Sequence, residues 1–193
     1  FDDIMRFLDN VLTDFILRAP DTMARAIYSA WRERSVGLGV MGFHTMLQRR
    51  DIPFESAVAK GMNMQIFKKI RAQADNASQR LAAERGACPD AIDGGANERF
   101  SCKLAIAPTA SISTIAGGAS PCIEPIPYNA YNHKTLTGSH AIYNQDLKRH
   151  LAKHGMDTPE VWSDIIENGG SVQHLEDLPQ RTRDIFKTGP EID

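Results

Sequence analysis

A hydroxyl-rich stretch near the middle of the chain has residue types that bind phosphate. The apolar run Leu104–Ala107 leads through Pro108 into Thr109, Ser111 and Ser113. We expect the run to form a short buried strand that ends at Pro108, because proline has no backbone N–H to donate. The hydroxyls would then lie beside the unpaired N–H groups of a helix start, where an anion is stabilised. The pattern therefore predicts a phosphate site.

Two observations bear on this prediction in opposite directions. No Asp or Glu occurs from Arg99 to Ile123, although the chain has 24 acidic residues, so no local carboxylate would repel an anion. However, a strand-to-helix turn whose Ser and Thr side chains only cap the helix would have a similar sequence. A strong phosphate loop also tends to carry more glycine and a lysine. The residue types alone leave both interpretations open.

The same stretch resembles a loop of a known family. Ala107–Ser113, followed by Gly117–Gly118 and Ile123–Pro125, is similar to the substrate-phosphate loop of the large, catalytic chain of ribonucleotide reductase. Other segments resemble this family in the same order along the chain: Leu8–Val11, Val36–Phe43, Ala83–Pro89, Lys134–Ser139, Gly170–Leu175, and Ile185–Thr188 with Glu191–Asp193. Together they span nearly the whole sequence, so the chain is identified as a member of this family.

Length and periodicity indicate the fold class. The 193 residues are 42% hydrophobic and alternate helices with short apolar strands, which favours an α/β fold with one sizeable core. The resemblance implies a helix-rich part, the second half, of a ten-stranded α/β barrel built from two five-stranded halves. We expect residues 1–193 to be a single segment of that catalytic barrel domain, truncated at both ends, because Phe1 already lies in a helix pattern. Alone, such a segment would leave strand edges and apolar residues uncovered.

Apolar periodicity, capping residues and breakers predict where the helices lie. The predicted helices cover residues 4–16, 20–34, 56–86, 144–155, 158–169 and 179–187. Ser56, Asn144 and Thr158 are the expected caps. Val36–Phe43 is expected to be extended and closely packed through its glycines, rather than a dinucleotide loop, and Asp90–Asn97 to be a surface connection.

The resemblance also implies which residues bind the substrate. Pro108, Thr109, Ala110, Ser111 and Ile112 would hold its phosphates, through backbone N–H groups and the hydroxyls of Thr109 and Ser111. The helix dipole supplies roughly half a positive charge at such a turn, so no lysine is needed.

Two residues beside this loop would have less direct roles. Ser113 would cap the following turn or join the groups that bind phosphate. Glu124 is expected to be a buried acid before Pro125, and a buried acid must be paired. The resemblance places it near the substrate, where it could orient backbone groups.

No catalytic residue is expected in this segment. The resemblance implies a reaction in which a thiyl radical abstracts a ribose hydrogen and a cysteine pair then reduces the ribose. The residues responsible would precede the matched region, and the radical-relay tyrosines and shuttle cysteines would follow it. We therefore expect Cys88, Cys102 and Cys122 to pack as small hydrophobic residues. His150 and His154 are expected on a solvated helix face rather than at a metal.

Details of the motifs favour the oxygen-dependent class of reductase, which acts on ribonucleoside diphosphates. This class implies as partners the remainder of the catalytic chain, a metal-bearing small subunit that generates the radical, and a thioredoxin- or glutaredoxin-type dithiol. No cofactor is expected on this segment, and the effectors ATP and dATP would bind elsewhere. The alternatives are a cobalamin-dependent reductase, which would use adenosylcobalamin, and a nucleotide-binding module or structural half-barrel without activity.

Charge and hydropathy exclude other classes of partner. The net charge is −2 and no basic block occurs, which argues against nucleic-acid binding. No apolar stretch approaches the roughly 20 residues of a membrane span. Three cysteines at no metal-like spacing indicate a reducing compartment, so a cytoplasmic protein is expected.

Overall fold

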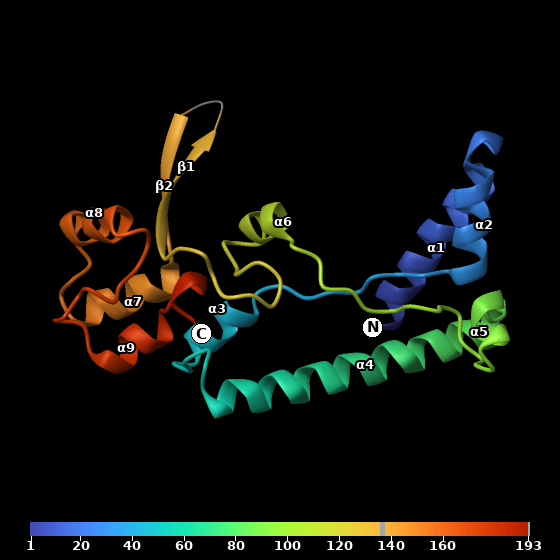
Figure 1. Ribbon diagram of the computed structural model, residues 1–193, viewed down its shortest axis with the longest axis horizontal. Helices are drawn as coiled ribbons and strands as arrows, with labels where there is room; N and C mark the ends of the chain where they lie inside the picture. The colour runs from blue at the N-terminus through green and yellow to red at the C-terminus, as the bar shows by residue number, and fades with distance from the viewer. Residues whose placement is uncertain (136–137, 193) are drawn as a thin grey trace. The chain divides into compact units, whose positions relative to one another are not determined.

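The computed structural model describes residues 1–135 and 138–192. The chain forms two compact units (Figure 1). Unit 1 comprises Phe1–Gly39 and Met64–Ala107, and unit 2 comprises Val40–Asn63 and Pro108–Asp193. No helix among the described residues is both long and apolar enough to cross a membrane.

Unit 1 consists mostly of helices. They are α1 (Asp2–Arg18), the 3-10 helix η1 (Asp21–Met23), α2 (Ala24–Glu33), most of α4 (Ala57–Arg85) and α5 (Pro89–Asp93). The helices predicted over residues 4–16, 20–34 and 56–86 are confirmed, and Ser56 Oγ caps α4 by accepting a hydrogen bond from Ala59 N at 3.1 Å. The α5 helix lies where only a surface connection was expected, because Pro89 in its first turn favours a helix start.

The core of unit 1 joins α1 to the C-terminal half of α4. Its buried members are Met5, Ala74, Ala77, Leu81 and Phe100. The apolar stripe predicted along α1 is only partly right, because Phe7 and Val11 are 65% and 51% exposed whereas Leu8 packs against the core. On α2, Tyr28 and Trp31 are 59% and 48% exposed. Apolar side chains therefore remain uncovered, as expected for a barrel segment by itself.

The glycine-rich segment before residue 40 packs closely against residues 102–105. Leu38 and Leu104 form a parallel bridge, and Ala105 N donates to Leu38 O at 3.1 Å. A Cβ atom on Gly39 would lie 2.7 Å from Ala105 O, and one on Gly37 would lie 2.9 Å from Ala105 Cβ. Close backbone packing, the role predicted for these glycines, is confirmed.

The prediction of a short buried strand over Leu104–Ala107 is wrong. Only Leu104 forms a bridge, and Ile106 is 67% exposed. The run has a backbone partner on one side, and the described residues place no strand on its other side. Without that neighbour, the apolar side chains beyond Leu104 have no surface on which to pack.

A buried carboxylate surrounded by arginines holds α1 in unit 1. Asp9 is fully buried and accepts from Arg34 Nε at 2.9 Å, Arg99 Nε at 2.8 Å and Arg85 Nη1 at 2.8 Å. Burial alone would raise the pKa of Asp9, but hydrogen bonds from Arg99 and Arg85 and the charge of Arg34 outweigh it, so this pKa is lowered. Asp9 is therefore ionised in the folded unit.

The substitution Asp9→Asn tests this cluster. It keeps the side-chain shape but leaves three guanidinium groups around a neutral amide, so we expect a loss of about 3–5 kcal/mol in the free energy of unfolding. Asp14→Asn is the matched control on the same helix, because Asp14 pairs with Arg18 at the surface, and it should change stability by less than about 0.5 kcal/mol. Urea unfolding at neutral pH measures both. Equal effects would contradict the assigned role of Asp9.

Unit 2 contains the remaining elements. They are α3 (Phe43–Arg49), the first turns of α4, α6 (Ala110–Ile115), β1 (Ala130–Thr135), β2 (Gly138–Tyr143), α7 (Gln145–Lys153), α8 (Pro159–Glu167), α9 (Gln180–Ile185) and η2 (Gly189–Glu191). The helices predicted over residues 144–155, 158–169 and 179–187 are confirmed. Asn144 Oδ1 accepts from Asp146 N at 3.0 Å, and Thr158 Oγ1 accepts from Val161 N at 3.4 Å, so both predicted caps form.

The core of unit 2 lies among α7, α8 and α9. Leu147, Leu151, Ile165, Val172 and Phe186 are all completely buried there. Trp162 of α8 packs its ring 4.6 Å from that of Tyr143, which ties the end of β2 to this core. The base of the hairpin is thereby fixed.

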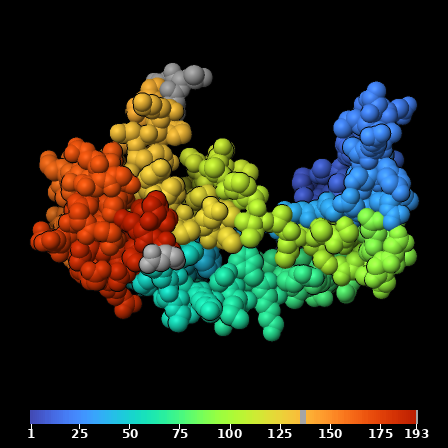
Figure 2. Space-filling view, viewed as in Figure 1, coloured from blue at the N-terminus to red at the C-terminus, as the bar shows by residue number. Residues whose placement is uncertain are grey.

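The antiparallel hairpin β1–β2 was not predicted, and it projects from the rest of unit 2 (Figure 1, Figure 2). Its register pairs Ala130 with Tyr143 and continues to Thr135 and Gly138. The family-like segment Lys134–Ser139 spans its tip, of which residues 136 and 137 lie outside the described residues, as does Asp193 of the segment Glu191–Asp193.

Candidate functional site

The predicted phosphate loop forms the start of a short helix, as expected. Thr109 precedes α6 in the left-handed conformation, with φ 49° and ψ 25°. The first backbone bond of the turn runs from Ser113 N to Thr109 O at 2.9 Å. The N–H groups of Ala110, Ser111 and Ile112 are therefore those that a helix start leaves without an intrahelical acceptor.

The hydroxyls of this loop have different surroundings. Thr109 Oγ1 does not cap α6, but accepts a hydrogen bond from Cys122 N at 2.9 Å. Ser113 is buried, and its Oγ donates back to Ala110 O at 2.9 Å. Ser111 is exposed, and its hydroxyl makes no hydrogen bond within the described part of the chain. The simple capping interpretation therefore does not account for this loop, and Ser111 is available to a ligand.

Two glycines end α6. Gly117 and Gly118 have φ angles of 83° and 73°, in the left-handed region that favours glycine. Gly118 N donates to Ser113 O at 3.1 Å, which closes the helix after little more than one turn. The chain then reverses toward Ser120.

The α3 helix holds the segment that follows α6. Thr45 N donates to Ser120 Oγ at 3.1 Å, and Ser120 N donates to Thr45 Oγ1 at 2.7 Å. Gly42 N also donates to Ser120 O at 2.8 Å. Thr45 and Ser120 are both buried, so this reciprocal pair fixes where the chain leaves the loop.

His44 provides a second attachment. Its Nδ1 accepts a hydrogen bond from Ile126 N at 3.0 Å, which places the proton of the neutral ring on Nε2. His44 is fully buried, and burial lowers its pKa from 6.5 to about 4 despite a hydrogen bond with the backbone of Ile185. The imidazole is therefore neutral at physiological pH and acts as a structural acceptor.

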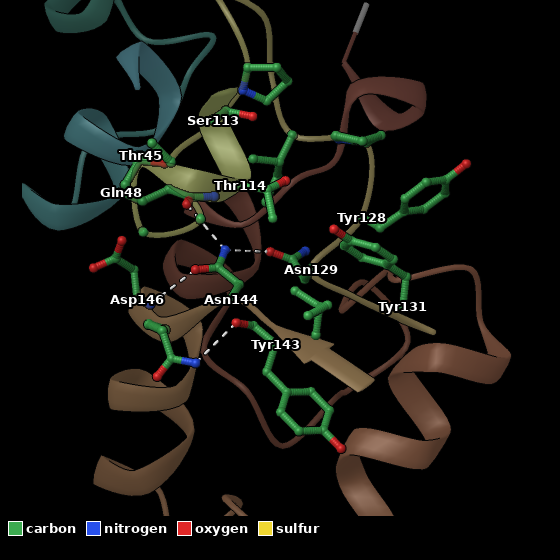
Figure 3. Close-up of a pocket in the computed structure, with 18 of the residues that line it drawn as sticks. Thr45, Gln48, Ser113, Thr114, Tyr128, Asn129, Tyr131, Tyr143, Asn144 and Asp146 are labelled. Atoms are coloured by element: carbon green, nitrogen blue, oxygen red, sulfur yellow. Dashed lines mark hydrogen bonds between the residues drawn. The ribbon is translucent and has the colours of Figure 1, made fainter. Parts of the chain in front are cut away.

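A cavity of about 340 Å³ lies beside α6 (Figure 3). Its walls come from α3, α6, the turn at Gly117–Gly118 and the base of the hairpin, where Tyr128, Tyr131 and Tyr143 contribute aromatic rings. Of the predicted phosphate residues, only Ala110 and Ser113 line it; Pro108, Thr109, Ser111 and Ile112 do not. The start of α6 and this cavity are thus separate features of the same helix.

A network of amides supports the cavity wall (Figure 3). Asn144 Nδ2 donates to Gln48 Oε1 at 3.1 Å and to Asn129 Oδ1 at 2.9 Å. Asn129 Nδ2 in turn donates to Phe186 O at 2.7 Å. These amides already have protein partners, so they position the hairpin. Sequence reasoning missed this network and His44, because partners 15 to 96 positions apart leave no local pattern.

The family model for the ribonucleotide reductase barrel domain matches residues 1–97 and 93–193. The chain belongs to the ribonucleotide reductase family. The large subunit of ribonucleoside-diphosphate reductase from Invertebrate iridescent virus 6 is 45% identical over 98% of this chain and 20% of its own length. The putative large subunit from Frog virus 3 is 43% identical over 98% of this chain and 34% of its own length. The chain thus spans a minor part of either relative.

A solved ribonucleotide reductase has the same fold. The alpha subunit of the class Id enzyme from Actinobacillus ureae matches with a TM-score of 0.85 and 36% identity, over 97% of this chain and 34% of that one. The helix-rich α/β fold predicted here is therefore that of a reductase barrel segment.

Glu124 and one cysteine differ from expectation within this reductase segment. Glu124 is exposed, so the premise that it is a buried and paired acid is wrong. Cys88 and Cys122 are buried, which confirms that they pack as small hydrophobic residues. Cys102 is exposed, because it lies at the edge where the pairing with Val36 begins.

The two helical histidines do not act as a pair. His150 Nε2 lies 2.9 Å from Asp51 Oδ1, and its ring packs 5.0 Å from that of Phe186. His154, one turn later, is exposed. His150 therefore links α7 to the segment after α3.

The buried neutral state of His44 predicts a pH-dependent stability. The folded pKa is about 4 and the ordinary value is 6.5, so the unfolded chain binds the extra proton and stability falls as the pH drops from 6.5 toward 4. Between pH 7 and pH 5 the loss should be about 2 kcal/mol. His44→Asn keeps an acceptor for Ile126 N but cannot titrate. Urea unfolding at both pH values should show a smaller loss in this variant; an equal loss would refute the assignment.

Proposed function

We propose that this chain is a segment of the catalytic barrel domain of a ribonucleoside-diphosphate reductase and that it binds the diphosphate of the substrate. The complete enzyme would convert ribonucleoside diphosphates to deoxyribonucleotides by radical chemistry. The observation that carries the proposal is the free start of α6, where Ser111 is exposed and the backbone N–H groups of residues 110–112 have no intrahelical acceptor. The printed names of the relatives support the substrate class.

The loop would bind phosphate through well-placed N–H and O–H donors more than through charged side chains. Backbone N–H groups of Ala110, Ser111 and Ile112 would donate to phosphate oxygens, and the Ser111 hydroxyl would add one donor. The Oγ1 of Thr109 is engaged by Cys122 N, so Thr109 would shape the loop while its hydroxyl proton remains able to donate. Ser113 and Pro108 would hold the two ends, and Glu124 would lie nearby in solvent.

The remaining chemistry would belong to other chains and other parts of the enzyme. The described residues offer no group of three or more His, Cys, Asp or Glu that could hold a metal ion. A metal-bearing small subunit would supply the radical, and a thioredoxin-type dithiol would supply electrons. The class Id solved structure supports the oxygen-dependent branch over a cobalamin-dependent one. ATP and dATP would bind elsewhere.

The three cysteines are free thiols, which supports the proposal that the enzyme works in a reducing compartment such as the cytoplasm. The uncovered apolar residues of α1 and α2 would be covered by the remainder of the catalytic chain.

Reduction of CDP by an assembled enzyme tests the proposal. This chain would be combined with a polypeptide carrying the rest of a reductase large subunit and with the radical-generating subunit. We expect turnover only in the full mixture. Ser111→Ala should raise KM about tenfold, because a hydrogen bond to a charged phosphate is worth about 1.5 kcal/mol.

Ser163→Ala is the matched control, since Ser163 is exposed on α8 and its hydroxyl donates to Glu167. It should leave KM unchanged. A stable assembly without any turnover would overturn the enzyme proposal and favour a nucleotide-binding module or a structural half-barrel. Turnover with an unchanged KM in Ser111→Ala would overturn the assigned role of the loop alone.

A further inference from the structure

The projecting hairpin carries a pair of histidines directly opposite each other. His133 of β1 is the register partner of His140 of β2. Directly opposed residues of an antiparallel pair point to the same face, with Cβ atoms about 4.5–5.5 Å apart. Two imidazoles at that spacing can converge on one ion, whose bonds to nitrogen are about 2.0–2.1 Å long for zinc.

The other histidines of the chain are engaged differently. His44 accepts from Ile126 N, His150 lies against Asp51 and His174 lies against Asp164. His133 and His140 are both exposed, and within the described residues neither has a hydrogen bond or an ion pair through its ring. Their ring nitrogens are therefore open to an external ligand.

The face that carries the two histidines also lacks a competing cation. Tyr131 and Ile142 form the adjacent rung on this face, and the Tyr131 ring lies edge-on to that of His133, with centroids 6.3 Å apart. Lys134 and its partner Ser139 belong to the opposite face, because side chains alternate along a strand. Among the described residues of the hairpin, no positive side chain shares the histidine face.

We propose that His133 and His140 form a surface site for a divalent transition-metal ion of the Cu²⁺ or Zn²⁺ class. Imidazole is a preferred ligand for these ions, and the order of affinities should follow Cu²⁺ above Zn²⁺. No group of three or more metal-ligating side chains occurs among the described residues, so water would complete the coordination and the ion would exchange readily. The inference does not depend on the proposed function.

Titration of the chain with Cu²⁺ in a non-coordinating buffer at neutral pH tests the site, with affinity from calorimetry and coordination from electron paramagnetic resonance. We expect one ion per chain bound by two imidazole nitrogens. His133→Gln and His140→Gln should each weaken binding at least about tenfold, since each removes one arm of the chelate. His154→Gln, at an exposed single histidine, is the matched control and should bind as the parent does.

Two results would overturn the site. One is an affinity in His140→Gln equal to that of the parent chain. The other is a resonance spectrum with a single coordinated imidazole. Because both histidines are exposed, the variants should fold, and an unchanged circular dichroism spectrum checks this.

Discussion

The reciprocal hydrogen bonds between Thr45 and Ser120 are the constraint on which the site in unit 2 depends. Each residue donates its backbone N–H to the side-chain oxygen of the other, and both are buried, so loss of either hydroxyl would leave a donor without an acceptor. The pair fixes Ser120 on α3, and the turn at Gly117–Gly118 then fixes α6. His44 secures the same segment at Ile126. The hydrogen bonds that position the loop that would bind phosphate are therefore between neutral groups.

In unit 1, a buried ionic cluster has the comparable role of holding separate elements together. Asp9 brings α1, the end of α2 and the end of α4 together through Arg34, Arg85 and Arg99. A lone carboxylate would be too costly to bury, and three guanidinium groups supply the compensation. In both units a buried polar anchor determines the arrangement, while much of the apolar surface of α1 and α2 stays exposed. Under the proposed function, the remainder of the reductase chain would cover that surface.

Sequence reasoning succeeded where the signal is local. The caps Ser56, Asn144 and Thr158 start helices because each one satisfies N–H groups two or three residues away. It failed where the structure depends on distant partners. The strand predicted at Leu104 does not form, because the run has no second neighbour among the described residues. The hairpin was missed because β2 is mostly exposed and shows no alternation of apolar residues. At the candidate site, the phosphate loop could be predicted from its resemblance to a family. The contacts of Thr109, Thr45 and His44 could not be predicted without knowledge of the fold.

The most direct test of the account is a nuclear magnetic resonance titration of the assembled large subunit, with ¹⁵N only in this chain. CDP and cytidine would be compared, since they differ only in the diphosphate. The account predicts that CDP shifts the amide resonances of Ala110, Ser111 and Ile112, and that cytidine does not. Shifts confined to other residues, or equal shifts with both ligands, would contradict a diphosphate site at the start of α6.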